Sequence, residues 1–264
     1  MKAVAESSAG ESAERAVGAT ELEIDDYDLA RFLAVAARFG TGAYGYVVTP
    51  NVDHMIRYRE DARFRALYRG ADYVLLDSRV AASLYRMVQG IRAPVCTGSD
   101  LTAALFEKVI APSDHVVLIG ASERQAALLR TRFGLTALRH YNPPMGFIDD
   151  AAEVEKCLAF AEAGGPFRFC LIAVGSPRQE ILACRLAQRG QARGLALCIG
   201  AAIDFLTGAE RRAPAWMRRV GLEWLYRLWR NPRRLAWRYL VRGPKFFAYV
   251  GTSKLRLRPV RAGD

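Results

Sequence analysis

One carboxylate of the chain stands where a catalytic base could act. Asp77 directly follows the apolar run Tyr73-Val-Leu-Leu76, which is typical of a buried strand. A general base needs a suitable pKa and hydrogen-bond reach of the proton that it removes, and a carboxylate at a strand end can serve a hydroxyl substrate bound there. The same position also suits a cap for the following helix, so the pattern leaves both roles open.

The predicted strand before that of Asp77 ends with a hydroxyl side chain, Thr49, and is followed by an amide side chain, Asn51. The β-rich run Tyr44–Thr49 leads into Thr49-Pro-Asn51, and a helix through Met55 and Tyr68 follows. Both polar side chains can form hydrogen bonds to sugar hydroxyls. Either one can also cap the helix predicted over residues 53–69, and one residue can do both.

The segment Gly175-Ser-Pro-Arg-Gln-Glu180 joins a strand to a helix in a form that suits an anion. The glycine lets the backbone approach a ligand, Ser176 is expected to cap the helix, and Pro177 suits the first helical position. The free N–H groups of that helix end can bind an anion, to which Arg178 adds positive charge. Gln179 and Glu180 can hold hydroxyls. The alternative is an ordinary strand-to-helix turn with a solvated charged face.

These segments belong to a chain in which strands and helices alternate. Further strands are expected at residues 115–120, 136–141, 169–174 and 195–199, with helices between them. This alternation predicts an α/β fold, with a mainly parallel, Rossmann-like sheet flanked by helices. Such sheets bind ligands beyond the carboxyl ends of their strands. The polar and glycine residues at those ends are Thr49, Asn51, Asp77, Gly120, Gly175 and Gly200. The glycines do not form a GxGxxG pattern.

The chain ends are different in composition from this α/β region, which we assign to residues 21–210. Residues 1–20 lack the apolar core of a signal peptide and are predicted to be a disordered tail. Residues 211–264 hold four tryptophans, with fifteen Lys and Arg against two acidic residues, and the net charge of the whole chain is +11. The helical spacing of the apolar residues in this segment predicts a helical appendage. Its arginines could bind a diphosphate or, together with the tryptophans, lie at an anionic lipid surface. A solvated helix face is the remaining alternative.

Cysteine, histidine and hydropathy patterns exclude several classes of protein. The five cysteines include no CxxC pair and the three histidines are scattered, so neither a disulfide framework nor a metal site is predicted. This usage favours a reducing compartment. No apolar run approaches the roughly 20 residues of a membrane-spanning helix. The basic tail alone would fit a nucleic-acid binder, but no known nucleic-acid motif is present.

The ordered motifs resemble those of the WecG/TagA/CpsF glycosyltransferases, glycosyltransferase family 26, over roughly residues 40–245. The most specific are the segment 175–180 and the tail Gly221-Leu-Glu-Trp-Leu-Tyr-Arg227 with Pro232-Arg-Arg234. The others are Thr49-Pro-Asn51, Asp77, Gly98-Ser-Asp100, Gly120, Gly200-Ala-Ala-Ile-Asp-Phe205, Gly208, Arg212-Ala-Pro214 and Arg238-Tyr239.

The resemblance implies an inverting, metal-independent transferase without a cofactor, with Asp77 as base and Thr49, Asn51 and Gln179 in a polar pocket. It implies a UDP-sugar donor (N-acetylmannosamine, its uronic acid or glucose type) and an acceptor sugar linked to polyprenyl diphosphate. The product would enter surface polysaccharide biosynthesis. The appendage would close over the diphosphate and hold the enzyme peripherally on the anionic inner face of the cytoplasmic membrane. Substrate-binding residues are then expected at Thr49, Asn51, Gly98, Asp100, Gly120, Gly175, Arg178, Gln179, Glu180, Gly200, Asp204, Arg212, Arg227 and Arg234.

One departure from the family pattern lies beside the expected base. The family often has glycine after this aspartate, whereas Ser78 and then Arg79 follow here. A serine can cap the same helix, which leaves Asp77 its role, but the choice of sugar is open. A non-catalytic peripheral membrane adaptor is the alternative function. Nucleic acid is not an expected partner, and a homo-oligomer is possible.

Overall fold

The structure, a computed structural model, describes residues 21–214, 216–217 and 220–261. The side chains at 227, 234, 235, 238 and 239 are not described either. The tail predicted at residues 1–20 lies outside these ranges.

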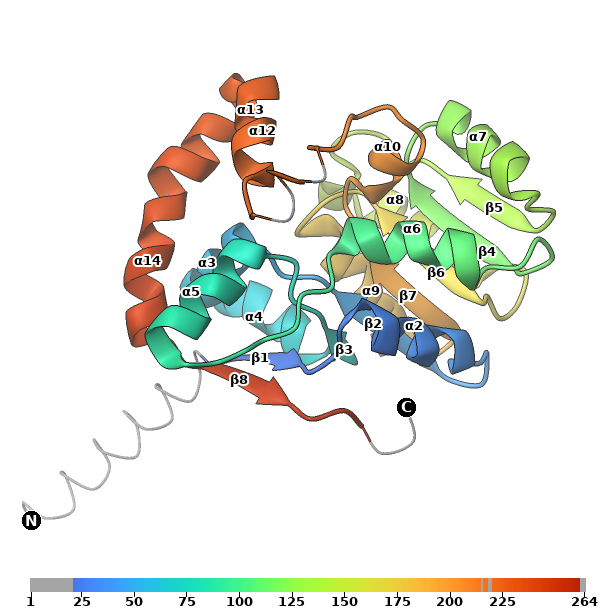
Figure 1. Cartoon of the computed structure of the whole chain (residues 1–264). Helices are drawn as coiled ribbons and strands as arrows, with labels where there is room; N and C mark the ends of the chain where they lie inside the picture. Colours follow the sequence, from blue (N-terminus) through green and yellow to red (C-terminus); the bar gives the residue numbers. More distant parts are fainter. Residues whose placement is uncertain (1–20, 215, 218–219, 262–264) are drawn as a thin grey trace, which may run out of the picture.

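A six-stranded parallel sheet forms the centre of the molecule (Figure 1). Its strand order is β3-β2-β7-β6-β4-β5, and every neighbouring pair is parallel. The strands are β2 (Tyr44–Val48), β3 (Tyr73–Val74), β4 (Val116–Gly120), β5 (Leu138–Tyr141), β6 (Phe169–Ala173) and β7 (Gly194–Cys198). The predicted α/β architecture with a parallel sheet is confirmed.

Helices cover both faces of this sheet. They are α2 (Leu29–Arg38), α3 (Val52–Glu60), α4 (Ala62–Arg69), α5 (Arg79–Gln89), α6 (Gly98–Lys108), α7 (Glu123–Phe133), α8 (Ala151–Glu162), α9 (Arg178–Arg189) and the short α10 (Ala202–Leu206). One apolar cluster joins the sheet to α3, α4, α8 and α9, and a second joins it to α2, α6, α7 and α10. The strands read as nearly continuous apolar runs because both of their faces are buried.

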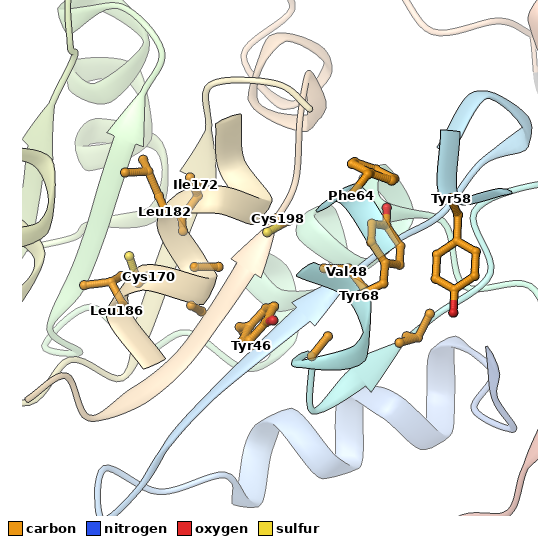
Figure 2. Packing of buried hydrophobic residues seen from close by; sticks show 14 of the residues in the cluster. Tyr46, Val48, Tyr58, Phe64, Tyr68, Cys170, Ile172, Leu182, Leu186 and Cys198 are labelled. Atoms are coloured by element: carbon orange, nitrogen blue, oxygen red, sulfur yellow. The ribbon is translucent and has the colours of Figure 1, made fainter. Parts of the chain in front are cut away.

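Alternate strand residues enter the two clusters. In β4, Val117 and Ile119 pack in the first cluster, whereas Val116 and Leu118 pack in the second. Figure 2 shows part of the first cluster, in which Tyr46 and Val48 of β2 and Cys170 and Ile172 of β6 lie among helix side chains. All five cysteines are free thiols, in agreement with the sequence analysis.

The helix predicted over residues 53–69 is two helices. Asp61 has an extended backbone, with φ −124° and ψ 112°, and separates α3 from α4. Its carboxylate accepts hydrogen bonds from the backbone N–H groups of Arg63 and Phe64. An aspartate that caps a new helix start favours such a break over continuation of the helix.

The appendage is helical for most of its length but ends in a strand. Its helices are α12 (Glu223–Arg230), α13 (Pro232–Ala236), the π-helical turn η2 (Trp237–Arg242) and α14 (Gly243–Thr252). Strand β8 (Leu255–Arg258) then pairs in parallel with β1 (Leu22–Asp25), which precedes the main sheet. The prediction of a wholly helical appendage, with the last strand at 195–199, is therefore wrong.

The two-stranded β1–β8 sheet is held by a buried carboxylate. Asp25 is 1 % exposed, and its Oδ2 accepts hydrogen bonds from the backbone N–H of Val74 at 2.6 Å and from Arg258 at 2.7 Å. The first contact ties β1 to β3 of the main sheet, and the second ties the end of the appendage to β1.

The appendage also contacts the α/β region through ion pairs on α3. Helix α14 packs against α3 and α5, and the three lie side by side in Figure 1. Arg242 pairs with Asp53 at 3.1 Å and with Glu60 at 3.3 Å, and Lys245 pairs with Glu60 at 3.4 Å. Within the described ranges, none of the helices combines the length and the apolarity that crossing a bilayer requires.

Candidate active site

A cavity of about 340 Å³ lies between the carboxyl ends of β2 and β3 and the appendage. Its polar wall comes from the loops after these strands and from the start of α6, and its apolar wall comes from α3, α5 and the appendage helices. The polar residues on the α/β side are Asn51, Asp53, Asp77, Ser78, Arg79, Thr97 and Ser99. Its size is in the range of small-molecule sites, which is roughly 300–1,000 Å³.

Asp77 contributes a carboxylate to this cavity. Its backbone N–H donates to the carbonyl of Pro50 at 2.9 Å, which fixes the β3–α5 loop against the β2–α3 loop. Ser78, not Asp77, caps α5, because the Ser78 hydroxyl accepts from the N–H of Ala81 at 3.1 Å. The cap alternative for Asp77 is thus excluded, and the expectation that Ser78 would take that position is confirmed.

Gly98 lets the first turn of α6 approach Asp77 and Thr49. A Cβ at position 98 would lie 3.0 Å from Thr49 Oγ1 and 3.8 Å from Asp77 Oδ2. Thr49 is buried, and its hydroxyl donates to the carbonyl of Cys198 at 3.5 Å. Three predicted site residues from separate segments of the chain therefore meet at one point.

Asn51 has both of the roles that its position suggested. Its side-chain oxygen accepts from the N–H groups of Asp53 at 3.1 Å and His54 at 3.4 Å, which caps α3. The residue also lines the cavity. Capping fixes the orientation of the amide, because the oxygen must face the helix end.

Asp100 joins two arginines at the rim of the site. It accepts from Arg212 at 2.9 Å and from the Thr97 hydroxyl at 2.8 Å, and Arg79 lies 3.9 Å away. Burial alone raises the pKa of the Asp100 carboxyl, but the Thr97 hydrogen bond and the Arg212 charge outweigh it and hold that pKa below its usual value. Asp100 is therefore an anion that orients Arg212, which also donates to Ser99 at 3.0 Å.

A second group of predicted residues lies deeper, around the start of α9. Gln179 accepts from the N–H of Gly200 at 2.9 Å and donates to Glu180 at 3.1 Å, so both ends of its amide are engaged. Glu180 is fully buried, and burial raises its pKa. The predicted Ser176 cap is wrong: α9 begins at Arg178, and Pro177 stands at the N-cap position, without a side-chain cap hydrogen bond, rather than at the first helical position.

The remaining predicted residues lie along the same edge of the sheet. Gly120 ends β4 with φ 93°, and a Cβ there would lie 2.8 Å from the carbonyl oxygen of Ala173. Gly175 has φ 77°, and Arg178 Nη2 is 3.4 Å from where its Cβ would be. Asp204, on α10, accepts from Gln125 at 2.7 Å. Arg227 and Arg234 have side chains outside the described part of the chain.

Several cavity residues were missed by the sequence predictions. Asp53 and Glu223 add carboxylates, Trp224 adds an aromatic ring and Arg79 adds a positive charge. Asp53 and Arg79 each lie two residues after a predicted site residue, and this closeness in sequence could have identified them as cavity residues. Glu223 and Trp224 belong to the motif Gly221–Arg227, whose resemblance implied an appendage that closes over the diphosphate but did not place these two side chains in the cavity of Asp77. Among the described residues, no group of three or more His, Cys, Asp or Glu is arranged to hold a metal ion.

Comparison with known proteins identifies a family and a relative with a named activity. Residues 17–260 match the glycosyl transferase WecG/TagA/CpsF family. The chain is also 25% identical over 207 residues to the N-acetylglucosaminyldiphosphoundecaprenol N-acetyl-beta-D-mannosaminyltransferase of Bacillus spizizenii, and the match covers 78% of each protein.

Proposed function

The chain belongs to the WecG/TagA/CpsF family of glycosyltransferases, and we propose that it transfers a hexose or N-acetylhexosamine from a UDP-sugar to a sugar on a polyprenyl diphosphate. The sugar would be of the N-acetylmannosamine, N-acetylmannosaminuronic acid or glucose type, and the product would serve surface polysaccharide biosynthesis. The relative from Bacillus spizizenii, whose name includes a diphosphoundecaprenol-linked sugar, supports this acceptor class.

The observation that carries the proposal is the position of Asp77. Its carboxylate lines a cavity at the carboxyl edge of the sheet, near the Thr49 hydroxyl and the first turn of α6. In a single displacement, Asp77 removes the proton of the acceptor hydroxyl, the hydroxyl oxygen attacks the anomeric carbon, and UDP leaves from the opposite face. Such a displacement inverts the anomeric configuration.

We place the donor nucleotide beside the loops after β4 and β6. The helix after β4 packs in one apolar cluster and the helix after β6 in the other, so the chain leaves these neighbouring strands toward opposite faces. Crevices of this kind are the usual ligand sites of parallel α/β sheets. Gly120 and Gly175 let the backbone approach a phosphate there, and Arg178 and Arg212 are the proposed cations for the leaving diphosphate. Arg227 and Arg234 keep that role as sequence predictions.

We further propose that the appendage binds the anionic inner face of the cytoplasmic membrane. Trp216, Trp229 and Trp237 are 61–76 % exposed, Arg230 is exposed beside Trp229 on α12, and Arg233 is exposed on α13. Exposed tryptophan beside arginine is suited to the lipid interface, where each basic residue contributes about 1 kcal/mol on an anionic leaflet.

Release of UDP tests the function directly. The full chain is incubated with single UDP-sugars and a short-chain lipid-diphosphate acceptor, and UDP is measured with and without EDTA. Acceptor-dependent UDP release that EDTA leaves unchanged is the expected result. A protein that binds anionic vesicles but releases no UDP from any donor would instead be a peripheral membrane adaptor.

A further inference from the structure

The cavity beside Asp77 changes in character along its length. Its polar residues lie in the strand-end loops and first helical turns, as Asn51 and Asp77 do. Its apolar residues include Ile56 and Leu84, which lie farther along α3 and α5, and Phe246 of α14. Both helices begin at the candidate active site, so the cavity runs from a polar end at the sheet to an apolar end beneath α14.

Helix α5 and the loop before it present three kinds of group to the cavity in a fixed order. The carboxylate of Asp77 comes before its first residue, Arg79 begins it, and Leu84 lies roughly 7.5 Å farther along the helix axis. Phe247 of α14 also lines the cavity and is 62 % exposed. The apolar wall therefore reaches the protein surface.

Arg79 has hydrogen-bonding capacity left for a ligand. Of the described residues that line the cavity, Arg79 alone is basic, and its side chain is 38 % exposed. Its guanidinium makes no hydrogen bond to another described residue, and its ion pair with Asp100 spans 3.9 Å. Since a guanidinium presents five N–H donors, Arg79 can bind phosphate oxygens without losing a close partner.

We propose that this cavity is the acceptor subsite and that it binds the first isoprenyl units of the lipid as well as the sugar and the diphosphate. This rests on the proposed function. The order carboxylate, guanidinium and apolar wall along α5 matches the order hydroxyl, diphosphate and prenyl chain in such an acceptor. Asp77 faces the sugar hydroxyl, Arg79 binds the acceptor diphosphate, and Leu84, Phe246 and Phe247 contact the isoprenyl carbons.

Binding of farnesyl diphosphate to the full chain tests this assignment without any sugar. The dissociation constant is measured by titration calorimetry, with inorganic diphosphate and farnesol as separate probes. Farnesyl diphosphate should bind more tightly than either part alone. Leu84→Ser and Phe247→Ser should each weaken it about tenfold, because each removes apolar contact from the prenyl chain, and should leave inorganic diphosphate binding unchanged. Arg79→Gln should weaken both diphosphate ligands.

Met87→Ser is the matched control, because Met87 lies on the same helix, is 74 % exposed and does not line the cavity. Phe247→Ser keeps the test decisive if Leu84→Ser fails to fold, since the exposed Phe247 contributes little to the core. Unchanged affinity for farnesyl diphosphate in Phe247→Ser and Arg79→Gln would overturn the assignment, even if the enzyme releases UDP normally. The expected binding pattern without UDP release from any donor would instead refute the proposed function.

Discussion

The carboxylate of Asp100 accepts a 2.9 Å hydrogen bond from the guanidinium of Arg212, which lies 112 residues later in the chain. The pair joins the first turn of α6 to the start of the appendage, beside the cavity that contains Asp77. Its geometry fixes the position of a cation that we propose for the leaving diphosphate.

Loss of this cation should slow transfer. Arg212→Ala removes a charge-assisted hydrogen bond and a positive charge, so kcat/KM for the UDP-sugar should fall by about 10–100-fold, in line with about 1.5–3 kcal/mol for such interactions. The kcat/KM of Arg212→Lys should lie between the values of the wild type and Arg212→Ala, because lysine keeps the positive charge but lacks the planar guanidinium. Steady-state kinetics measure this, and wild-type kcat/KM in Arg212→Ala would exclude Arg212 from the site.

Asp77→Asn should abolish most of the activity and leave the fold intact. The amide has nearly the same shape but cannot accept the acceptor proton, so kcat should drop by about 10²–10⁴-fold. UDP affinity and Tm should not change. Asp114→Asn is the matched control, because Asp114 lies in a surface loop where its carboxylate caps the N–H of Ala111. Normal turnover by Asp77→Asn would remove the base assignment.

Arg258→Ala should destabilise the protein through the β1–β8 sheet. The change leaves the buried Asp25 carboxylate without its ion-pair partner, at a cost of about 1.5–3 kcal/mol. Urea unfolding followed by circular dichroism measures the free energy of unfolding. The neighbouring Arg256 is exposed, so Arg256→Ala should have little effect. Equal stability of both variants would show that the ion pair contributes nothing.

Burial of Glu180 should make stability depend on pH. Its folded pKa is raised above the ordinary value of 4.5 because the carboxyl is buried, whereas the unfolded chain ionises at that value. Below pH 4.5 both states are protonated, and above it the unfolded state loses its proton first, so stability falls as pH rises toward the folded pKa. Glu180→Gln cannot ionise. The Tm difference between Glu180→Gln and wild type should therefore grow from pH 4 to pH 8. A Tm difference that stays constant over this pH range would refute the prediction.

Replacement of exposed tryptophans should release the enzyme from membranes. Trp229→Ser with Trp237→Ser removes two apolar side chains that are 76 % and 67 % exposed. Sedimentation with phosphatidylglycerol vesicles should show at least about tenfold weaker binding, and high salt should weaken the wild type too. Met145→Ser, at a 94 % exposed position outside the appendage, is the control. Retained vesicle binding would place the membrane contact elsewhere.

The sequence predicted the α/β architecture because most of its strands are continuous apolar runs that alternate with capped helices. It also predicted that Asp77, Thr49 and Asn51 lie near one another, since the carboxyl ends of parallel strands share one edge. It did not predict β8, because Leu255–Arg258 is four residues long and its alternation of leucine and arginine is too short to stand out. It did not place Glu223 and Trp224 in the cavity of Asp77 either, because their position depends on how the appendage folds back over α3 and α5.

The pairing of β1 with β8 also affects the order in which the protein matures. Asp25 and Arg258 are 233 residues apart, so β1 leaves the ribosome long before its partner strand has been translated. The α/β region can therefore fold first, and α14 can pack against α3 and α5 before β8 emerges and pairs with β1. A nascent chain halted before β8 would keep the ion pairs of Arg242 and Lys245 with α3 but would leave the buried Asp25 carboxylate without Arg258.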